Sequence, residues 1–215
     1  AAAYAALDRD ARGVLISAVG IEADTSFAKW RRAGEAAAST QVSILRPGLV
    51  MADTSYGGTS LARALAALPL RTPVIGDGQQ VFNPIHAEDL AQIALHCLEN
   101  PPPQGAHLVG GPQDITQSDL ADRLRGWLGH APLPKLHLPL RIAHSMGRIG
   151  DALNLGPISR TAIAQLEHGV HAPMSAQLNN APPARGVAEF IATRPAGSQD
   201  IWHARLYLMR PLVRL

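Results

Sequence analysis

The sequence predicts an α/β fold with a partial, doubly wound parallel sheet, and three observations carry this prediction. Residues 13–17 (GVLIS) and 42–45 (VSIL) are short apolar runs without polar alternation, as in strands buried on both faces of a parallel sheet. Residues 27–39 between them are rich in alanine with lysine, arginine and glutamate, which favours a helix. Strand, helix and strand within about 35 residues make one βαβ unit, whose connection is almost always right-handed.

The same alternation continues after this unit. Residues 59–68 (TSLARALAAL) predict a second helix with an N-cap at Thr59 or Ser60. Residues 74–75 predict a short strand, and the Gly-Asp-Gly of residues 76–78 predicts a turn after it.

Two further helices and one strand complete this part of the prediction. Residues 87–98 predict a helix whose apolar stripe includes Cys97, and residues 107–109 predict a strand. Thr116 is expected to open the next helix, because Asp119 follows three residues later as in a capping box.

The amino-acid composition changes near residue 130, where proline, histidine and glycine become frequent. We therefore divide the chain into a sheet domain at residues 1–130, a mostly helical cap at 131–195 and a basic tail at 196–215. Arg205, Arg210 and Arg214 with the neighbouring aromatics make this tail amphipathic, which fits a surface helix or a segment at a membrane surface.

Composition excludes several classes of protein. With 47% hydrophobic and 17% charged residues the chain can form a core, and its single cysteine excludes a disulfide framework or a multi-cysteine metal site. No run of about 18 apolar residues occurs, and no signal-peptide pattern opens the chain. The net charge of +2 includes no dense basic patch with stacking aromatics, so no nucleic-acid partner is expected. No metal is expected either, because cysteine and carboxylate partners are scarce near His168 and His171.

A glycine-rich dinucleotide motif, G-x-G-x-x-G, does not occur in the sequence. Only a short segment precedes the first predicted strand, as expected for a doubly wound domain whose first half is missing. The sequence is therefore interpreted as a fragment from inside a longer protein.

Three segments carry a resemblance in their order and spacing: residues 16–20 (ISAVG), 45–50 (LRPGLV) and 82–91 (FNPIHAEDLA). Together they resemble the atypical and extended short-chain dehydrogenases/reductases, which are NAD-dependent epimerase/dehydratase-like Rossmann proteins. Residues 55–61 and 194–212 further resemble a bacterial subgroup in which such a domain precedes a DoxX-like membrane domain. This resemblance implies NAD or NADP as the cofactor, a small-molecule substrate and a cytoplasmic location, with the inner face of the membrane as the alternative.

The resemblance also implies which residues form the site. Family members transfer a proton with a Tyr-x-x-x-Lys pair that shares one helix face, helped by a serine at the strand end. The matching positions here are Phe27, Arg31 and Ser17. Phenylalanine has no acidic proton, whereas a permanently charged arginine can still hold a ribose or a phosphate.

The remaining expected site residues surround this motif. Arg46, Pro47, Gly48 and Val50 follow a strand and are expected to line the cofactor with Ser17 and Arg31, although a strand-terminating turn explains Pro47 and Gly48 equally well. Tyr56 and His86 are the expected substrate contacts.

Three functions stay open at this stage: an NAD(P)-dependent oxidoreductase or epimerase-like enzyme, a non-catalytic dinucleotide-binding module at the membrane, and an inactive truncated product.

Overall fold

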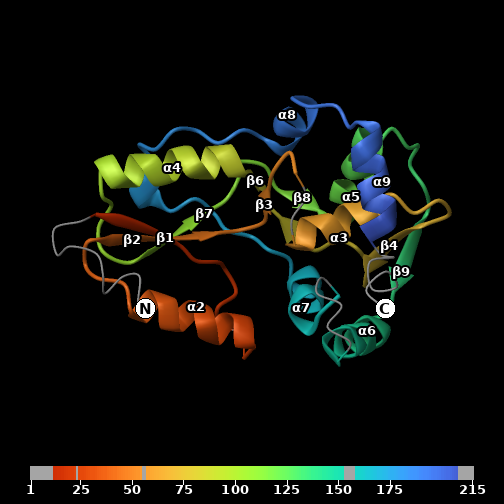
Figure 1. Ribbon diagram of the computed structural model, residues 1–215, viewed down its shortest axis with the longest axis horizontal. Coiled ribbons are helices and arrows are strands. Elements are labelled where there is room, and N and C mark those ends of the chain that lie inside the picture. Colours follow the sequence, from red (N-terminus) through yellow and green to blue (C-terminus); the bar gives the residue numbers. More distant parts are fainter. Residues whose placement is uncertain (1–11, 23, 55–56, 153–157, 208–215) are drawn as a thin grey trace. The chain divides into compact units, whose positions relative to one another are not determined.

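The computed structural model describes residues 12–22, 24–54, 57–152 and 158–207 (Figure 1). The chain has the α/β fold with a parallel sheet that the sequence predicts. It divides into two compact units that alternate along the chain. Unit 1 contains residues 1–50, 83–114 and 170–187, and unit 2 contains residues 51–82, 115–169 and 188–215. The predicted division into 1–130, 131–195 and 196–215 follows the sequence order and stays a prediction.

Unit 1 is organised by a parallel three-stranded sheet in the order β1-β2-β7. Its strands are β1 (Gly13–Ile16), β2 (Val42–Pro47) and β7 (Ala106–Val109). Gly13 lies opposite Val42 and Ile44 lies opposite Ala106. All three strands were predicted from their apolar runs, and their carboxyl ends meet at one edge of the sheet.

Two helices cover the opposite faces of this sheet (Figure 1). Helix α2 (Ser26–Ala36) begins after Thr25, whose hydroxyl accepts a hydrogen bond from the Ala28 amide at 3.1 Å. Helix α4 (Ala87–Glu99) turns Leu90, Ile93 and Cys97 toward the sheet.

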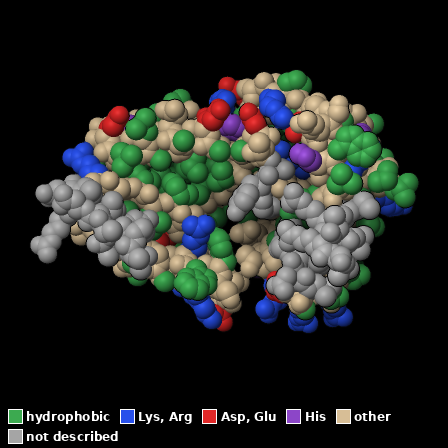
Figure 2. All heavy atoms as spheres, viewed as in Figure 1, with side chains coloured by type: hydrophobic (Ala, Val, Ile, Leu, Met, Phe, Trp, Pro, Cys, Tyr) green, Lys and Arg blue, Asp and Glu red, His purple; other side chains and the backbone are tan. Residues whose placement is uncertain are grey.

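The core of unit 1 lies between α4 and the sheet, and Figure 2 shows hydrophobic side chains gathered there. It contains seven buried side chains, from β2, β6 (Ile85–His86), α4, β7 and the short helix η1 (Ala176–Leu178). These are Leu45, Ile85, Leu90, Ile93, Cys97, Val109 and Leu178. Burial raises the pKa of the Cys97 thiol, which is consistent with the core position that the stripe predicts.

Unit 2 contains two small sheets with helices packed on them. Strands β4 (Thr72–Ile75) and β9 (Lys135–Leu138) pair in parallel, and β5 (Val81–Phe82) pairs antiparallel with β8 (Ile115–Thr116). The helices are α3 (Gly57–Ala66), α5 (Gln117–Trp127), α6 (Leu140–Ala152), α7 (Arg160–His168) and α9 (Ser198–Tyr207). Strand β3 (Val50–Met51) and helix α8 (Val187–Ala192) begin at the unit boundaries.

Two expectations about local structure are confirmed in unit 2. The Thr116 hydroxyl accepts a hydrogen bond from the Asp119 amide at 3.1 Å and donates to the Asp119 carboxylate at 2.8 Å, which caps α5. Gly76 and Gly78 adopt φ angles of 59° and 72°, a conformation that the predicted turn requires of glycine.

One other expectation about local structure is wrong. Helix α3 begins at Gly57, so Thr59 and Ser60 are not its N-cap; both lie inside the helix and are buried. Residues 135–138 form strand β9, which the sequence analysis did not predict, within the segment expected to be irregular and mostly helical. The sequence KLHL has no clear hydrophobic pattern of a strand. Its partner β4 lies about 60 residues away, and a local sequence pattern cannot predict such a distant pairing.

No helix within the described ranges combines the length and the apolar character needed to cross a bilayer.

Candidate functional site

The expected site residues of the dehydrogenase-like motif gather at the carboxyl end of β1. Ser17 follows the last residue of β1, and its amide donates to the Leu45 carbonyl at 2.7 Å, which continues the pairing with β2. The Ser17 side chain is 3% exposed, and its hydroxyl forms no hydrogen bond within the described residues, although after Arg46 it helps to lower the pKa of the Glu35 carboxyl on α2. A hydroxyl is therefore present at the strand end, but it faces the helix packed on the sheet.

Phe27 and Arg31 lie on one face of α2 and contact each other. The Arg31 guanidinium carbon is 5.1 Å from the centroid of the Phe27 ring, within the range of a cation–π contact. Arg31 Nη1 also donates a hydrogen bond to the Ile16 carbonyl at 2.9 Å. The hydrogen bond to Ile16, the last residue of β1, and the contact with the Phe27 ring together hold Arg31 at the carboxyl edge of the sheet.

Arg31 keeps donor atoms for a ligand in this position. Its Nε and Nη2 make no hydrogen bond to the part of the chain that the structure describes, and the side chain is partly exposed. A guanidinium can therefore still donate to a hydroxyl or a phosphate oxygen here. Phe27 offers only a ring face, so this pair can orient a ligand and cannot transfer a proton.

Arg46 is occupied by carboxylates. Its Nε and Nη2 donate to the two carboxylate oxygens of Glu35 at 2.9 and 2.7 Å, and its Nη1 lies 3.5 Å from Glu22. The Arg46 guanidinium lowers the pKa of Glu35, and Glu35 raises the pKa of Arg46. This forked ion pair joins β2 to α2, and the cofactor contact expected of Arg46 stays a prediction.

Pro47 and Gly48 end β2 within a packed part of unit 1. The Pro47 carbonyl accepts from the Val19 amide at 3.2 Å, and the Gly48 amide donates to the Val109 carbonyl at 3.0 Å. A Cβ on Gly48 would lie 3.2 Å from the Ala172 Cβ and 3.3 Å from Asn83 Oδ1. This close approach explains the glycine without a cofactor, whose contact with Pro47 and Gly48 stays a prediction.

Val50 and His86 are engaged by partners other than Arg31. Val50 packs against the core of unit 1. His86 is 4% exposed and caps α4, with its Nδ1 accepting from Arg185 Nη2 at 2.9 Å. Arg185 also binds the Asp89 carboxylate at 2.9 Å. Tyr56 lies outside the described residues. The substrate roles of His86 and Tyr56 stay predictions.

Three residues that organise this region were missed by the sequence analysis. Glu35 binds Arg46, Arg185 binds His86 and Asp89, and Asn83 joins two segments that are 89 residues apart. Glu35 could have been proposed, since it lies one turn after Arg31 on the same helix. No local signal marks Arg185 or Asn83, because their partners are distant in sequence.

Titration of Glu35 gives a testable pH dependence. Because its pKa is lower in the folded state than in the unfolded chain, the Arg46 pair contributes stability that is complete above the unfolded pKa. This contribution is lost as the pH falls through the folded pKa. We expect Glu35→Gln to lower the free energy of unfolding at neutral pH by about 1 kcal/mol, and to reduce its decline toward acid pH. Chemical denaturation at neutral and acid pH measures both quantities.

The control for this prediction is Asp24→Asn. Asp24 pairs with Lys29 at 2.9 Å in the same region, but the two side chains are 87% and 64% exposed. Exposed pairs contribute little, so this variant should unfold like the wild type at neutral pH. Equal effects of the two substitutions would contradict a stabilising role of the Arg46–Glu35 pair.

Within the described ranges, no group of three or more histidine, cysteine or carboxylate side chains is arranged to hold a metal ion.

No family model and no curated protein matches this sequence. Several solved structures, however, are similar to this chain. The chain is similar to an NADPH-dependent quinone oxidoreductase from Escherichia coli complexed with NADPH, with a TM-score of 0.58, 18% identity, and coverage of 84% of this chain and 64% of that chain. It is also similar to a human epimerase family protein solved with NADPH, with a TM-score of 0.56, 18% identity, and coverage of 97% and 69%.

A third similar structure is a dTDP-glucose 4,6-dehydratase from Bacillus anthracis in complex with NAD. Its TM-score is 0.49 at 14% identity, with 60% of this chain and 49% of that chain covered. The chain thus spans between 49% and 69% of the length of these three proteins. At such identities the likeness establishes the fold, and this chain has the Rossmann-like fold seen in epimerase and reductase structures.

Proposed function

We propose that this chain is part of an NAD(P)-dependent oxidoreductase or epimerase-like protein of the short-chain dehydrogenase/reductase type. The observation that supports this proposal most is the position of Arg31, held by the Ile16 carbonyl and the Phe27 ring at the carboxyl edge of the parallel sheet. Ligands of open α/β sheets bind outside the carboxyl ends of the strands. The similar structures from Escherichia coli and human were solved with NADPH.

In this proposal the residues at the end of β1 contact the reacting end of the cofactor. Arg31 donates from Nε and Nη2 to ribose or phosphate oxygens, and the Phe27 ring forms an apolar wall. When bound, a nicotinamide dinucleotide supplies hydride transfer. No residue in the Phe27–Arg31 pair supplies a proton, so protonation of a substrate needs a group outside this pair.

A non-catalytic dinucleotide-binding module is the second candidate. The contact between Arg31 and the Phe27 ring favours it, because it uses the two motif positions for packing and orientation. Turnover of carbonyl compounds with NADH or NADPH by the full-length protein supports the enzyme, whereas cofactor binding without turnover supports the module.

We further propose that the chain belongs to the bacterial subgroup in which such a domain precedes a DoxX-like membrane domain. The basic tail at residues 196–215 would then lie at a membrane surface. Arg205 is exposed on α9, and Arg210 and Arg214 lie outside the described residues. Charge reversal at these three arginines should reduce flotation of the chain with anionic vesicles, and unchanged flotation would contradict an electrostatic membrane contact.

The role of Arg31 is tested by titrating NADPH into the wild type and into Arg31→Ala while following nicotinamide fluorescence. We expect the variant to bind about tenfold more weakly, because a charge-assisted hydrogen bond is lost. Lys29→Ala is the matched control, since it removes an exposed cation from the same helix that pairs only with Asp24 among the described residues. Equal affinity of Arg31→Ala and the wild type would exclude Arg31 as a cofactor contact.

A further inference from the structure

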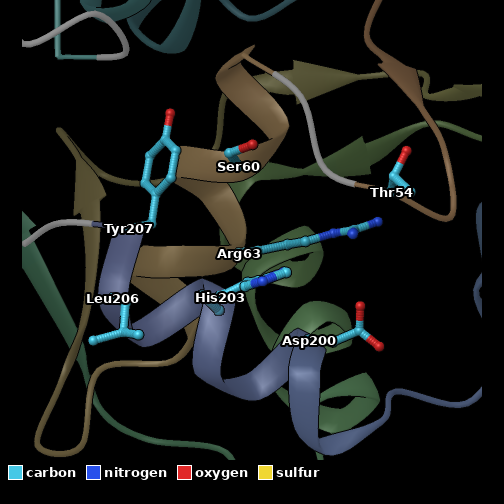
Figure 3. A pocket seen from close by; sticks show the side chains of 8 residues that line it. Thr54, Ser60, Arg63, Asp200, His203, Leu206 and Tyr207 are labelled. Carbon is cyan, nitrogen blue, oxygen red and sulfur yellow. The ribbon is translucent and has the colours of Figure 1, made fainter. Parts of the chain in front are cut away.

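Unit 2 contains a pocket of about 490 Å³ between one face of α3 and one face of α9 (Figure 3). Ser60 and Arg63 are one turn apart on α3, and Asp200, His203 and Tyr207 recur at helical spacing on α9. Thr54 completes the polar lining. The volume is in the range of pockets that bind small molecules.

Arg63 is a buried cation in the lining of this pocket. Its side chain is 7% exposed, and within the described ranges no acidic group forms an ion pair with it. Its Nη1 and Nη2 donate to the Asp53 and Ala52 carbonyls at 3.1 and 2.6 Å, and the guanidinium carbon lies 4.7 Å from the Trp127 ring centroid. Burial lowers the pKa of Arg63, so the charge is held at a cost in solvation that an anion would offset.

The acidic group in the lining is already paired. Asp200 accepts from Arg194 Nη2 at 2.9 and 3.2 Å and from the Gly197 amide at 2.9 Å. Burial raises the pKa of Asp200, but the Gly197 amide, Arg194 and Arg63 together outweigh it and lower the pKa. Asp200 and Asp53 attract the Arg63 guanidinium through space, but the hydrogen bonds of Asp200 go to Arg194 and Gly197, and no carboxylate of the described residues forms a salt bridge with Arg63.

Further hydrogen-bonding groups accompany this charge. The Ser60 and Thr54 hydroxyls and the His203 ring make no hydrogen bond to any described residue, and all three side chains line the pocket. In Figure 3 the Arg63 and His203 side chains extend toward the same side of the pocket, where Thr54 and Asp200 lie. Ala204 and Leu206 add an apolar part to the lining.

We propose that this pocket binds a small organic anion. Its carboxylate or phosphate group lies against Arg63 with hydrogen bonds from Ser60, Thr54 and His203, and its apolar part contacts Ala204 and Leu206. The shared chemistry of the two possible groups is an oxyanion, which a guanidinium and hydroxyls recognise. This site consists only of unit 2 residues and is separate from the Arg31 contact in unit 1.

Calorimetric titration of the full chain with benzoate, phenyl phosphate and benzyl alcohol tests the proposal. Benzoate and phenyl phosphate share an aromatic ring and differ in the oxyanion, and benzyl alcohol has the ring without the charge. We expect saturable binding of at least one anion, with benzyl alcohol about tenfold weaker or undetectable. The tighter of the two anions identifies the oxyanion class. Absence of binding by both anions, or equal binding of benzyl alcohol, would overturn the proposal.

Variants locate the site. Arg63→Met should abolish anion binding. Because Arg63 also donates to the Ala52 and Asp53 carbonyls, this substitution can disturb the fold. Ser60→Ala is a second variant that keeps these hydrogen bonds. We expect Ser60→Ala to weaken binding several-fold with an unchanged melting temperature. Arg71→Ala, which removes an exposed cation of unit 2 outside the pocket lining, should leave affinity unchanged. If Ser60→Ala binds like the wild type while Arg71→Ala weakens binding, the anion binds a surface cation and the pocket assignment is wrong.

Discussion

Replacement of Asn83 by alanine is expected to lower the free energy of unfolding by about 3 kcal/mol. The Asn83 side chain is 2% exposed and forms two hydrogen bonds with the backbone of Ala172. Its Nδ2 donates to the Ala172 carbonyl at 2.9 Å, and its Oδ1 accepts from the Ala172 amide at 2.8 Å. Truncation leaves a buried donor and a buried acceptor without partners, and each costs about 1–3 kcal/mol.

Urea denaturation of Asn83→Ala measures this loss. Asn180→Ala is the matched control, because Asn180 lies near Ala172 in sequence but is exposed. A loss in Asn83→Ala no larger than that in Asn180→Ala would show that the amide contact does not stabilise unit 1.

Replacement of Gly111 by alanine is expected to destabilise the chain to a similar extent, by about 3 kcal/mol. A Cβ at this position would fall on the Pro84 carbonyl, and the Gly111 amide already donates to the Asn83 carbonyl at 3.0 Å. Backbone lies on both sides of the contact, so the added methyl group forces the 83–84 and 110–111 segments apart.

Gly126→Ala is the control for this steric argument. Gly126 lies in α5 with no atom within 4 Å of the position of a Cβ, so alanine there should stabilise the helix by up to about 1 kcal/mol. Thermal unfolding should therefore show opposite shifts for the two substitutions. A raised melting temperature for Gly111→Ala would contradict the close approach of these segments.

The elements that could be predicted are those with a strong local pattern. The apolar runs at residues 13–17 and 42–45 became β1 and β2, and the stripe of residues 87–98 became α4. The Thr116 cap also followed from spacing alone, because its partner Asp119 lies three residues away.

The elements that could not be predicted depend on distant partners. Strand β9 is specified by pairing with β4, and α3 begins before Thr59 because tertiary packing buries the hydroxyl side chains that could have capped it. Local propensity is weak against such tertiary contacts.

The candidate site shows the same division. The spacing of Phe27 and Arg31 predicted a shared helix face, and the structure brings the two side chains into contact. The ion pair of Arg46 with Glu35 and the hydrogen bonds of His86 with Arg185 were not predictable, because they join residues that are 11 and 99 positions apart. The Arg63 pocket was missed for the same reason, since α3 and α9 are distant from each other in sequence.

The proposed function requires that the chain contacts a nicotinamide dinucleotide through unit 1. Titration of the 215-residue chain with NADH and with NADPH, followed by nicotinamide fluorescence, tests it most directly. We expect saturable binding that Arg31→Ala weakens and Lys29→Ala does not. Absence of saturable binding by either cofactor, with the chain folded, would contradict it.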